Sequence, residues 1–267
     1  MASLLAFLLA PFLSAWRRRA VLRELSVREI QGAFSGSMLG LGWIVLQPLA
    51  SLAVFSLVFG VIFKQANGME FVSNLFTGLI FFNAFSESVT RASRLVLSRP
   101  NYVTKVVFPL DLLPWPPVAL AALHAAVSTV LLLVLHTVFV GVPTWSVLAL
   151  PLVLALVLML GLGVSFILAS VGVYVRDTNE VVRVVVQLLF FLSPVVWTVD
   201  NVKGTAFHGV MSLNPLAIAI NTARAMLSGE NWPSLVPLVG LAVGALLLTA
   251  FGHAFFRRTK DGFADVL

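Results

Sequence analysis

Three ionisable side chains in strongly apolar stretches of the sequence are candidates for a role within the bilayer: Glu87, His124 and His136. Such groups are costly at the depth of a bilayer and are usually functional there, as in proton- or ion-coupled transport. Glu87 stands four residues before Arg91, a spacing that favours an ion pair on one helix face. We expect the two histidines to make hydrogen bonds between helices. An ion-coupled secondary transporter stays open as an alternative, although three groups equip it poorly.

The sequence gives little support for a catalytic function. The chain has no Cys, and its four His are scattered without metal-ligand spacing, so we expect no metal site. It contains no G-x-x-x-x-G-K-[ST] motif that would hold nucleotide phosphates in a P-loop. No pair of carboxylates has a spacing suited to acid–base catalysis. We therefore expect no enzyme and no cofactor in this chain, and an energy source in a partner.

Aromatic residues are abundant, with 21 Phe and six Trp. Aromatic rings stack on the apolar faces of sugars, so a channel lined with them could pass a glycan. The alternative for each ring is a lipid-facing or interfacial position. The candidate channel-lining residues are Trp43, Phe81, Phe82, Phe85, Phe190, Phe191 and Trp197.

The composition indicates a membrane protein. Hydrophobic residues make up 60% and charged residues 10% of the 267 positions, against about 45–50% and 25% in soluble domains. The net charge of +6 fits loops that face anionic lipid, so we expect contact with membrane lipid and none with nucleic acid. The fold class predicted is an all-α integral membrane protein, with residues 1–267 forming one domain.

Six apolar runs of spanning length predict transmembrane helices. Residues 16–35 predict an amphipathic helix on the inner surface, residues 94–112 a cytoplasmic loop, and residues 200–233 an external segment with short re-entrant or interfacial helices. Residues 1–15 are expected to be interfacial or poorly ordered. The six runs are 38–63, 72–93, 113–141, 147–173, 181–199 and 234–256.

The distribution of Lys and Arg predicts the orientation. If both termini are cytoplasmic, 14 of the 17 basic residues face the cytoplasm, and only Lys64, Lys203 and Arg224 do not. The positive-inside rule therefore favours that topology.

Glycines recur at every fourth position in two places. Gly32, Gly36 and Gly40 form one series, and Gly240 and Gly244 form another. Small residues at this spacing allow close approach of helices in membranes, although chance accounts for the pattern equally well.

Several motifs, in their order and spacing, resemble the ABC-2 type permeases that export polysaccharides such as O-antigen, capsule and teichoic acid. The likeness covers nearly the whole chain from about residue 22. It departs in the apolar stretch Met1–Ala15 and in Phe81-Phe82-Asn83, where many members carry a Trp. The motifs are Ser37–Trp43, Gln47-Pro48-Leu49, Val58–Phe63, Phe85–Val89, Lys105–Pro114, Val173–Asp177, Phe191–Trp197, Asn214-Pro215-Leu216 and the C-terminal Phe255–Arg258 and Phe263–Leu267.

The resemblance implies a homodimer in a bacterial inner membrane, bound to two copies of a separate ATPase that holds ATP and Mg²⁺. Loop 94–112 would be the coupling helix that docks on the ATPase, through Arg99, Tyr102, Lys105, Phe108, Pro109 and Asp111. Aromatic anchors with a charged rim are typical of such contacts.

The substrate implied is a glycan on a polyprenyl-pyrophosphate carrier, in O-antigen and thus lipopolysaccharide biosynthesis or a related pathway. An exporter of small amphiphiles or drugs with the same architecture is the alternative. At the cytoplasmic gate, Arg17, Arg18, Arg19 and Arg28 would meet the pyrophosphate or lipid headgroups. Arg176 and Asp177 would form a structural or ATPase-facing pair.

Overall fold

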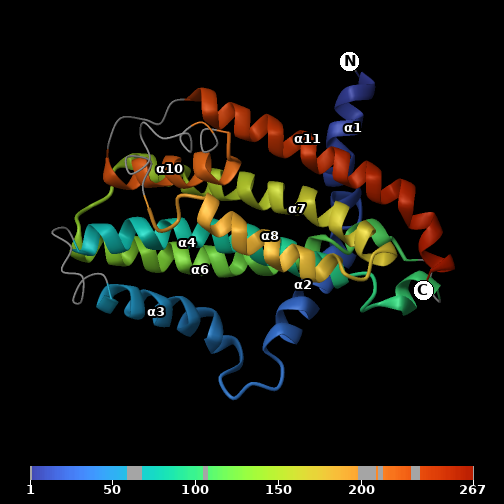
Figure 1. Ribbon diagram of the computed structural model, residues 1–267, viewed down its shortest axis with the longest axis horizontal. Helices are drawn as coiled ribbons and strands as arrows, with labels where there is room; N and C mark the ends of the chain where they lie inside the picture. Colours follow the sequence, from blue (N-terminus) through green and yellow to red (C-terminus); the bar gives the residue numbers. More distant parts are fainter. Residues whose placement is uncertain are drawn as a thin grey trace.

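The computed structural model describes residues 2–58, 68–104, 108–197, 209, 213–229 and 235–266. In this part of the chain every regular element is helical and no strand occurs, which confirms the predicted all-α class. The long helices lie side by side along the longest axis of the molecule, as Figure 1 shows.

Short 3-10 turns (η) connect several of the helices. The α-helices are α1 (Ala2–Arg17), α2 (Arg19–Phe34), α3 (Trp43–Phe55), α4 (Gly68–Thr90), α5 (Pro100–Thr104), α6 (Trp115–Phe139), α7 (Leu150–Tyr174), α8 (Thr178–Leu192), α10 (Pro215–Ser228) and α11 (Leu235–Thr259). The turns are η1 (Gly40–Gly42), η3 (Ala92–Arg94), η4 (Leu110–Leu112), η5 (Trp145–Ala149) and η7 (Lys260–Asp265).

Each of the six predicted spans corresponds to a helix, although 59–63, 198–199 and 234 lie outside the described residues. Four helical stretches in the described part of the chain are long and apolar enough to cross a bilayer: Gly40–Val58, Leu110–Phe139, Trp145–Tyr174 and Leu235–Asp265. The two other helices are α4, which has 23 residues and carries Glu70 and Glu87, and α8, which has only 15.

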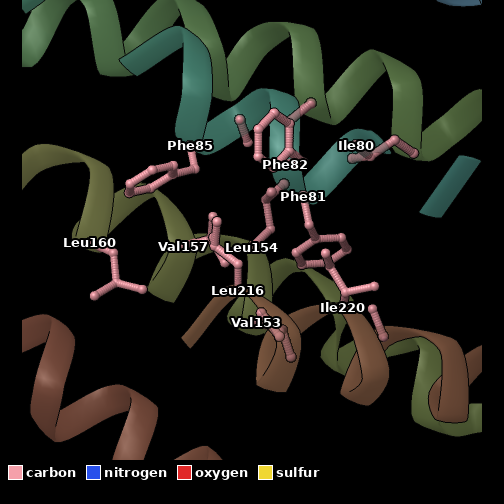
Figure 2. Close-up of a cluster of buried hydrophobic side chains, with 14 of the residues drawn as sticks. Ile80, Phe81, Phe82, Phe85, Val153, Leu154, Val157, Leu160, Leu216 and Ile220 are labelled. Atoms are coloured by element: carbon pink, nitrogen blue, oxygen red, sulfur yellow. The ribbon is translucent and has the colours of Figure 1, made fainter. Parts of the chain in front are cut away.

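Helix α7 lies at the centre of the bundle, between α4 and α11. It has no charged residue over its 25 positions. Lipid is as apolar as a protein core, so the helices associate through close van der Waals packing and interhelical hydrogen bonds. Figure 2 shows part of this core, in which side chains of α4, α7 and α10 meet: Ile80, Phe81, Phe82, Phe85, Val153, Leu154, Val157, Leu160, Leu216 and Ile220.

Glycines bring α7 and α11 into backbone contact. A Cβ atom added to Gly252 of α11 would lie 2.3 Å from the carbonyl oxygen of Gly163 in α7. The predicted series behave differently, because a Cβ on Gly240 or Gly244 would meet nothing within 4 Å. The same holds for the series from Gly32 to Gly40. Of the two interpretations left open by the sequence, the structure therefore gives no support within this chain to close helix approach at these glycines.

Two elements, α3 and α1, lie at the periphery of the bundle in Figure 1. The stretch Gly40–Val58, which includes α3, has only 6% of its residues buried. Helix α1 runs across the bundle axis and packs on α11. The start of the chain, predicted to be interfacial or poorly ordered, is therefore helical from Ala2.

Candidate functional site

The elements that carry the predicted cytoplasmic arginines gather at one end of the bundle. Helices α1 and α2, the segment from η3 to η4, the turn between α7 and α8 and the C-terminus all lie there (Figure 1). This arrangement matches the predicted grouping of basic residues. Lys105, the central basic residue of the predicted coupling loop, lies outside the described residues.

The loop 94–112 is anchored on the protein itself. The rings of Tyr102 and Phe108 pack together with centroids 4.5 Å apart. Both are half-buried against a core cluster that includes Leu113, Phe166 and Phe263. These aromatics therefore fix the loop on α7 and the C-terminal turn, which leaves only part of each ring for a partner. Pro109 precedes η4 and is half-buried.

Ion pairs join the N-terminal helices to this loop. Arg18, between α1 and α2, pairs with Asp111 at 3.2 Å. Glu29 of α2 pairs with Arg99 and with Arg91, the latter at 3.6 Å. Helix α2 is thus held near both of its ends, because these contacts attach it to residues on either side of α5.

The four predicted gate arginines differ in their contacts. Arg28 pairs with Glu24 one turn before it in α2, and Arg18 with Asp111. Arg19 lies over the ring of Trp16, 5.2 Å from its centroid, and both Arg17 and Arg19 are exposed. Arg18 and Arg28 are therefore already paired with carboxylates.

The ionisable groups within the apolar helices are paired as expected. Glu87 lies 3.5 Å from Arg91, which confirms the pair predicted from their spacing. It also hydrogen-bonds His124 of α6, with 2.7 Å between Oε2 and Nδ1. His136 of α6 hydrogen-bonds Ser73 of α4 at 3.0 Å. Both histidines thus connect α6 to α4.

A cavity of about 610 Å³ opens between α2, α3, α4 and α6. Glu87 and Arg91 line it where α4 ends, together with His124 of α6. Gln47 of α3 and Asn83 of α4 line it as well. The cavity therefore adjoins the ion pairs that hold α2 in place.

Arg224 of α10 is a buried cation that the sequence marked only as lying outside the cytoplasmic group. Its guanidinium donates to the carbonyl oxygens of Asn74 and Val195, each at 2.9 Å, and of Trp197 at 3.2 Å. No carboxylate pairs with it among the described residues. Burial lowers the pKa of Arg224 to about 10, which leaves it charged at neutral pH. It fastens the chain beyond α8 to α4 and α10.

Asn214 completes this fastening from the other end of α10. Its side chain caps α10 by accepting from the Leu216 amide at 2.9 Å, and it donates to the carbonyl of Leu192 at 3.2 Å. The end of α8 is therefore held where Pro194 follows and the helix stops.

The candidate channel aromatics fall into two groups. Phe81, Phe82 and Phe85 are buried in the core of a single chain. Phe191 is 68% and Trp43 41% exposed, whereas Phe190 and Trp197 are half-buried. Hydropathy does not separate the groups, because lipid-facing and core positions are equally apolar.

Arg176 and Asp177 lie in the turn between α7 and α8 and are both exposed. No ion pair joins them, nor does either pair with another residue that the structure describes. Asp177 is the N-cap residue of α8, and its carbonyl accepts from the amide of Val181 at 3.1 Å.

Comparison with known proteins identifies one matching family and several similar proteins. The ABC-2 type transporter family matches residues 20–227. The O-antigen export system permease protein RfbA of Myxococcus xanthus is 30% identical over 94% of this chain and 96% of its own length. RfbA of Klebsiella pneumoniae is 25% identical over 90% of this chain and 92% of its own length. The polysialic acid transport protein KpsM of Escherichia coli is 23% identical over 91% and 95%.

Proposed function

Because the chain belongs to the ABC-2 type transporter family, we propose that it is the membrane permease subunit of an ATP-driven exporter of polysaccharide. The likeness to O-antigen and polysialic acid export permeases over almost their full length carries this proposal.

We further propose two copies of this chain with a separate ATPase, which binds ATP and Mg²⁺. The protein would have six spans per chain, with α4 and α8 added to the four apolar stretches. The burial of α4 between α6 and α7 supports this count, because those neighbours both belong to candidate spans. Both termini would lie on the cytoplasmic side of a bacterial inner membrane.

In this proposal, loop 94–112 receives the ATPase and α2 moves with it. The ion pairs of Glu29 and Arg18 support such a coupling, since a shift of the loop pulls on both. The exposed Arg17 and Arg19 would meet the pyrophosphate of a polyprenyl-linked glycan. Trp43 and Phe191 are the aromatic candidates whose exposure best suits a channel.

Deletion of the gene in its native bacterium tests the function. We expect loss of one surface polysaccharide and accumulation of its carrier-linked form inside the cell, both reversed by the intact gene. Mass spectrometry of extracted lipid-linked glycans makes the measurement. Normal surface polysaccharide, with altered efflux of small amphiphiles instead, would contradict the proposal and favour an exporter of those compounds.

Co-purification from cells that express the chain together with its genomic neighbours tests the coupling loop. We expect the reversal of charge in Lys105→Glu to reduce ATPase recovery and ATP hydrolysis. Arg258→Glu is the matched control, because it makes the same change at an exposed position at the end of α11. Equal recovery with both variants would move the contact away from the loop.

A further inference from the structure

The cavity between α3, α4 and α6 has an unusual population of unpaired neutral polar groups. Its lining includes two carboxamide and three hydroxyl side chains that make no side-chain hydrogen bond within the part of the chain that the structure describes. They are Gln47, Ser51, Asn83, Ser86 and Ser128. Polar groups at the depth of apolar helices are costly when unsatisfied, so they indicate a hydrated or ligand-bearing space.

Several hydroxyl groups elsewhere in the bundle are satisfied within their own helix. Ser88, Thr129, Ser170 and Thr249 each donate to the carbonyl four residues earlier on their own helix. This bond is the usual way for a helical hydroxyl to be satisfied in an apolar environment. The free hydroxyls along the cavity therefore stay available to something that enters it.

The two carboxamides approach the cavity from different helices. Gln47 comes from α3 and Asn83 from α4, and both side chains are exposed. A carboxamide both donates and accepts hydrogen bonds, as a sugar hydroxyl does. His124 lines the cavity as well, with its Nδ1 atom held by Glu87.

The charges in the cavity argue against an anionic ligand. Arg91 is already engaged by Glu29 and Glu87. A phosphate entering here would meet the Glu87 carboxylate before any free cation. The polar lining also disfavours a purely apolar tail, which would leave the carboxamides unsatisfied.

We propose that this cavity is a binding subsite for a neutral, hydroxyl-rich sugar unit of the exported glycan. The proposal rests on the polysaccharide-export function. It adds the place where one sugar unit binds, within a single chain between α3 and the α4–α6 pair. Gln47 and Asn83 bind the hydroxyls from two sides, and the carrier's pyrophosphate stays outside the cavity. Phe34, which lies edge-on to His124 with centroids 5.7 Å apart, supplies an apolar surface near the Glu87–His124 pair.

The absence of Cys from the sequence makes a direct test available. Ala33→Cys, at an exposed position that lines the same cavity and is not one of the two binding residues, is introduced alone, and its reaction with N-ethylmaleimide is followed in membrane vesicles that also contain the ATPase. One set of vesicles comes from cells that assemble the glycan, and the other from cells that lack the enzyme starting it on its carrier. We expect labelling to be roughly tenfold slower with glycan present, a factor that corresponds to a free energy of about 1.4 kcal/mol.

Asp265→Cys is the control, because it is exposed at the C-terminal end and lies outside the cavity. Its labelling should be equal in the two sets. Equal rates for Ala33→Cys as well, in strains whose wild-type protein exports glycan, would overturn the subsite and leave the function intact. A thiol at position 33 that is unreactive in both sets would also overturn it. Failure of the wild-type protein to export would remove both proposals together.

A second comparison of variants separates the loss of sugar binding from a general disturbance of the helices. Gln47→Leu/Asn83→Leu removes both carboxamides without adding charge, so membrane insertion and ATPase recovery should be unchanged. We expect export at limiting glycan to fall roughly tenfold, as the loss of two hydrogen bonds predicts. Ala126→Leu, at an exposed position on α6 outside the cavity, should export normally. Full export by the double variant would contradict the proposal.

Discussion

Arg224 shows at the residue scale how the structure satisfies one buried charge with backbone carbonyls alone. The three acceptors come from Asn74, Val195 and Trp197, which lie 150, 29 and 27 residues from Arg224 in the sequence. No local pattern could have predicted this cluster. The Glu87–Arg91 pair could be predicted, because both groups lie one turn apart on the end of a single helix.

The first prediction concerns this buried guanidinium. Arg224→Met leaves three carbonyl oxygens without a donor, so we expect the free energy of unfolding to fall by about 2–4 kcal/mol. Thermal unfolding of the purified protein in detergent measures the change. Arg94→Met, at a 62% exposed side chain, is the control and should change stability little. Equal effects of the two variants would show that the three carbonyl bonds contribute nothing.

A second residue-scale prediction tests the attachment of α2. Glu29 is 12% exposed and pairs with two arginines, whereas Glu24 on the same helix is 64% exposed and pairs with one. We expect Glu29→Gln to loosen α2 by about 1 kcal/mol and Glu24→Gln to have almost no effect, since exposed pairs contribute little. Hydrogen exchange of amides 19–34 measures both. Unchanged exchange in Glu29→Gln would mean that apolar packing of Leu25 alone holds the helix.

At the scale of elements, the contact between α7 and α11 depends on the absence of side chains. The Gly252 position has no room for a Cβ beside the Gly163 carbonyl, and Gly163 itself would meet the Leu248 backbone at 2.8 Å. The four-residue spacing of glycines on α11 pointed to Gly240 and Gly244 instead. Spacing identifies a small-residue face, but the relative rotation of two helices decides which glycines meet.

This contact gives a third prediction. Gly252→Val forces α7 and α11 apart, at a cost of about 1–3 kcal/mol or more because the obstacle is backbone. We expect a lower unfolding temperature and a smaller monodisperse fraction in size-exclusion chromatography. Gly244→Val makes the same change on the same helix in open space and should behave as wild type. A Gly252→Val protein as stable as the control would contradict the packing.

At the scale of the whole molecule, the structure places the described basic loops at one end and leaves the loop after α6 at the other. Val142 in that loop is 88% exposed. Asp265 lies at the opposite end, near the C-terminus. The two ends of the bundle should therefore face different compartments.

The fourth prediction uses this separation. In cells with a permeabilised outer membrane and an intact inner membrane, we expect an impermeant maleimide to label Val142→Cys and to spare Asp265→Cys. Disruption of the inner membrane should make both reactive. The reverse pattern would invert the proposed orientation, and labelling of both at the start would contradict a membrane crossing between them.

The membrane class, the helical fold and the positions of the apolar helices follow from the sequence by itself. They depend on local hydropathy and length, because each bilayer helix satisfies its own backbone. The motifs also sufficed to indicate the ABC-2 type family, which the comparison confirms.

Only the tertiary structure decided which apolar residues face protein and which face outward. Phe82 is 5% exposed in the core, and Phe191 is 68% exposed on α8, although both are phenylalanines in apolar helices. The sequence likewise could not predict that Gln47, Asn83 and His124 line one cavity. Lipid and protein core are alike in polarity, so hydropathy carries no information about faces, and contacts between distant residues exist only once the helices have packed.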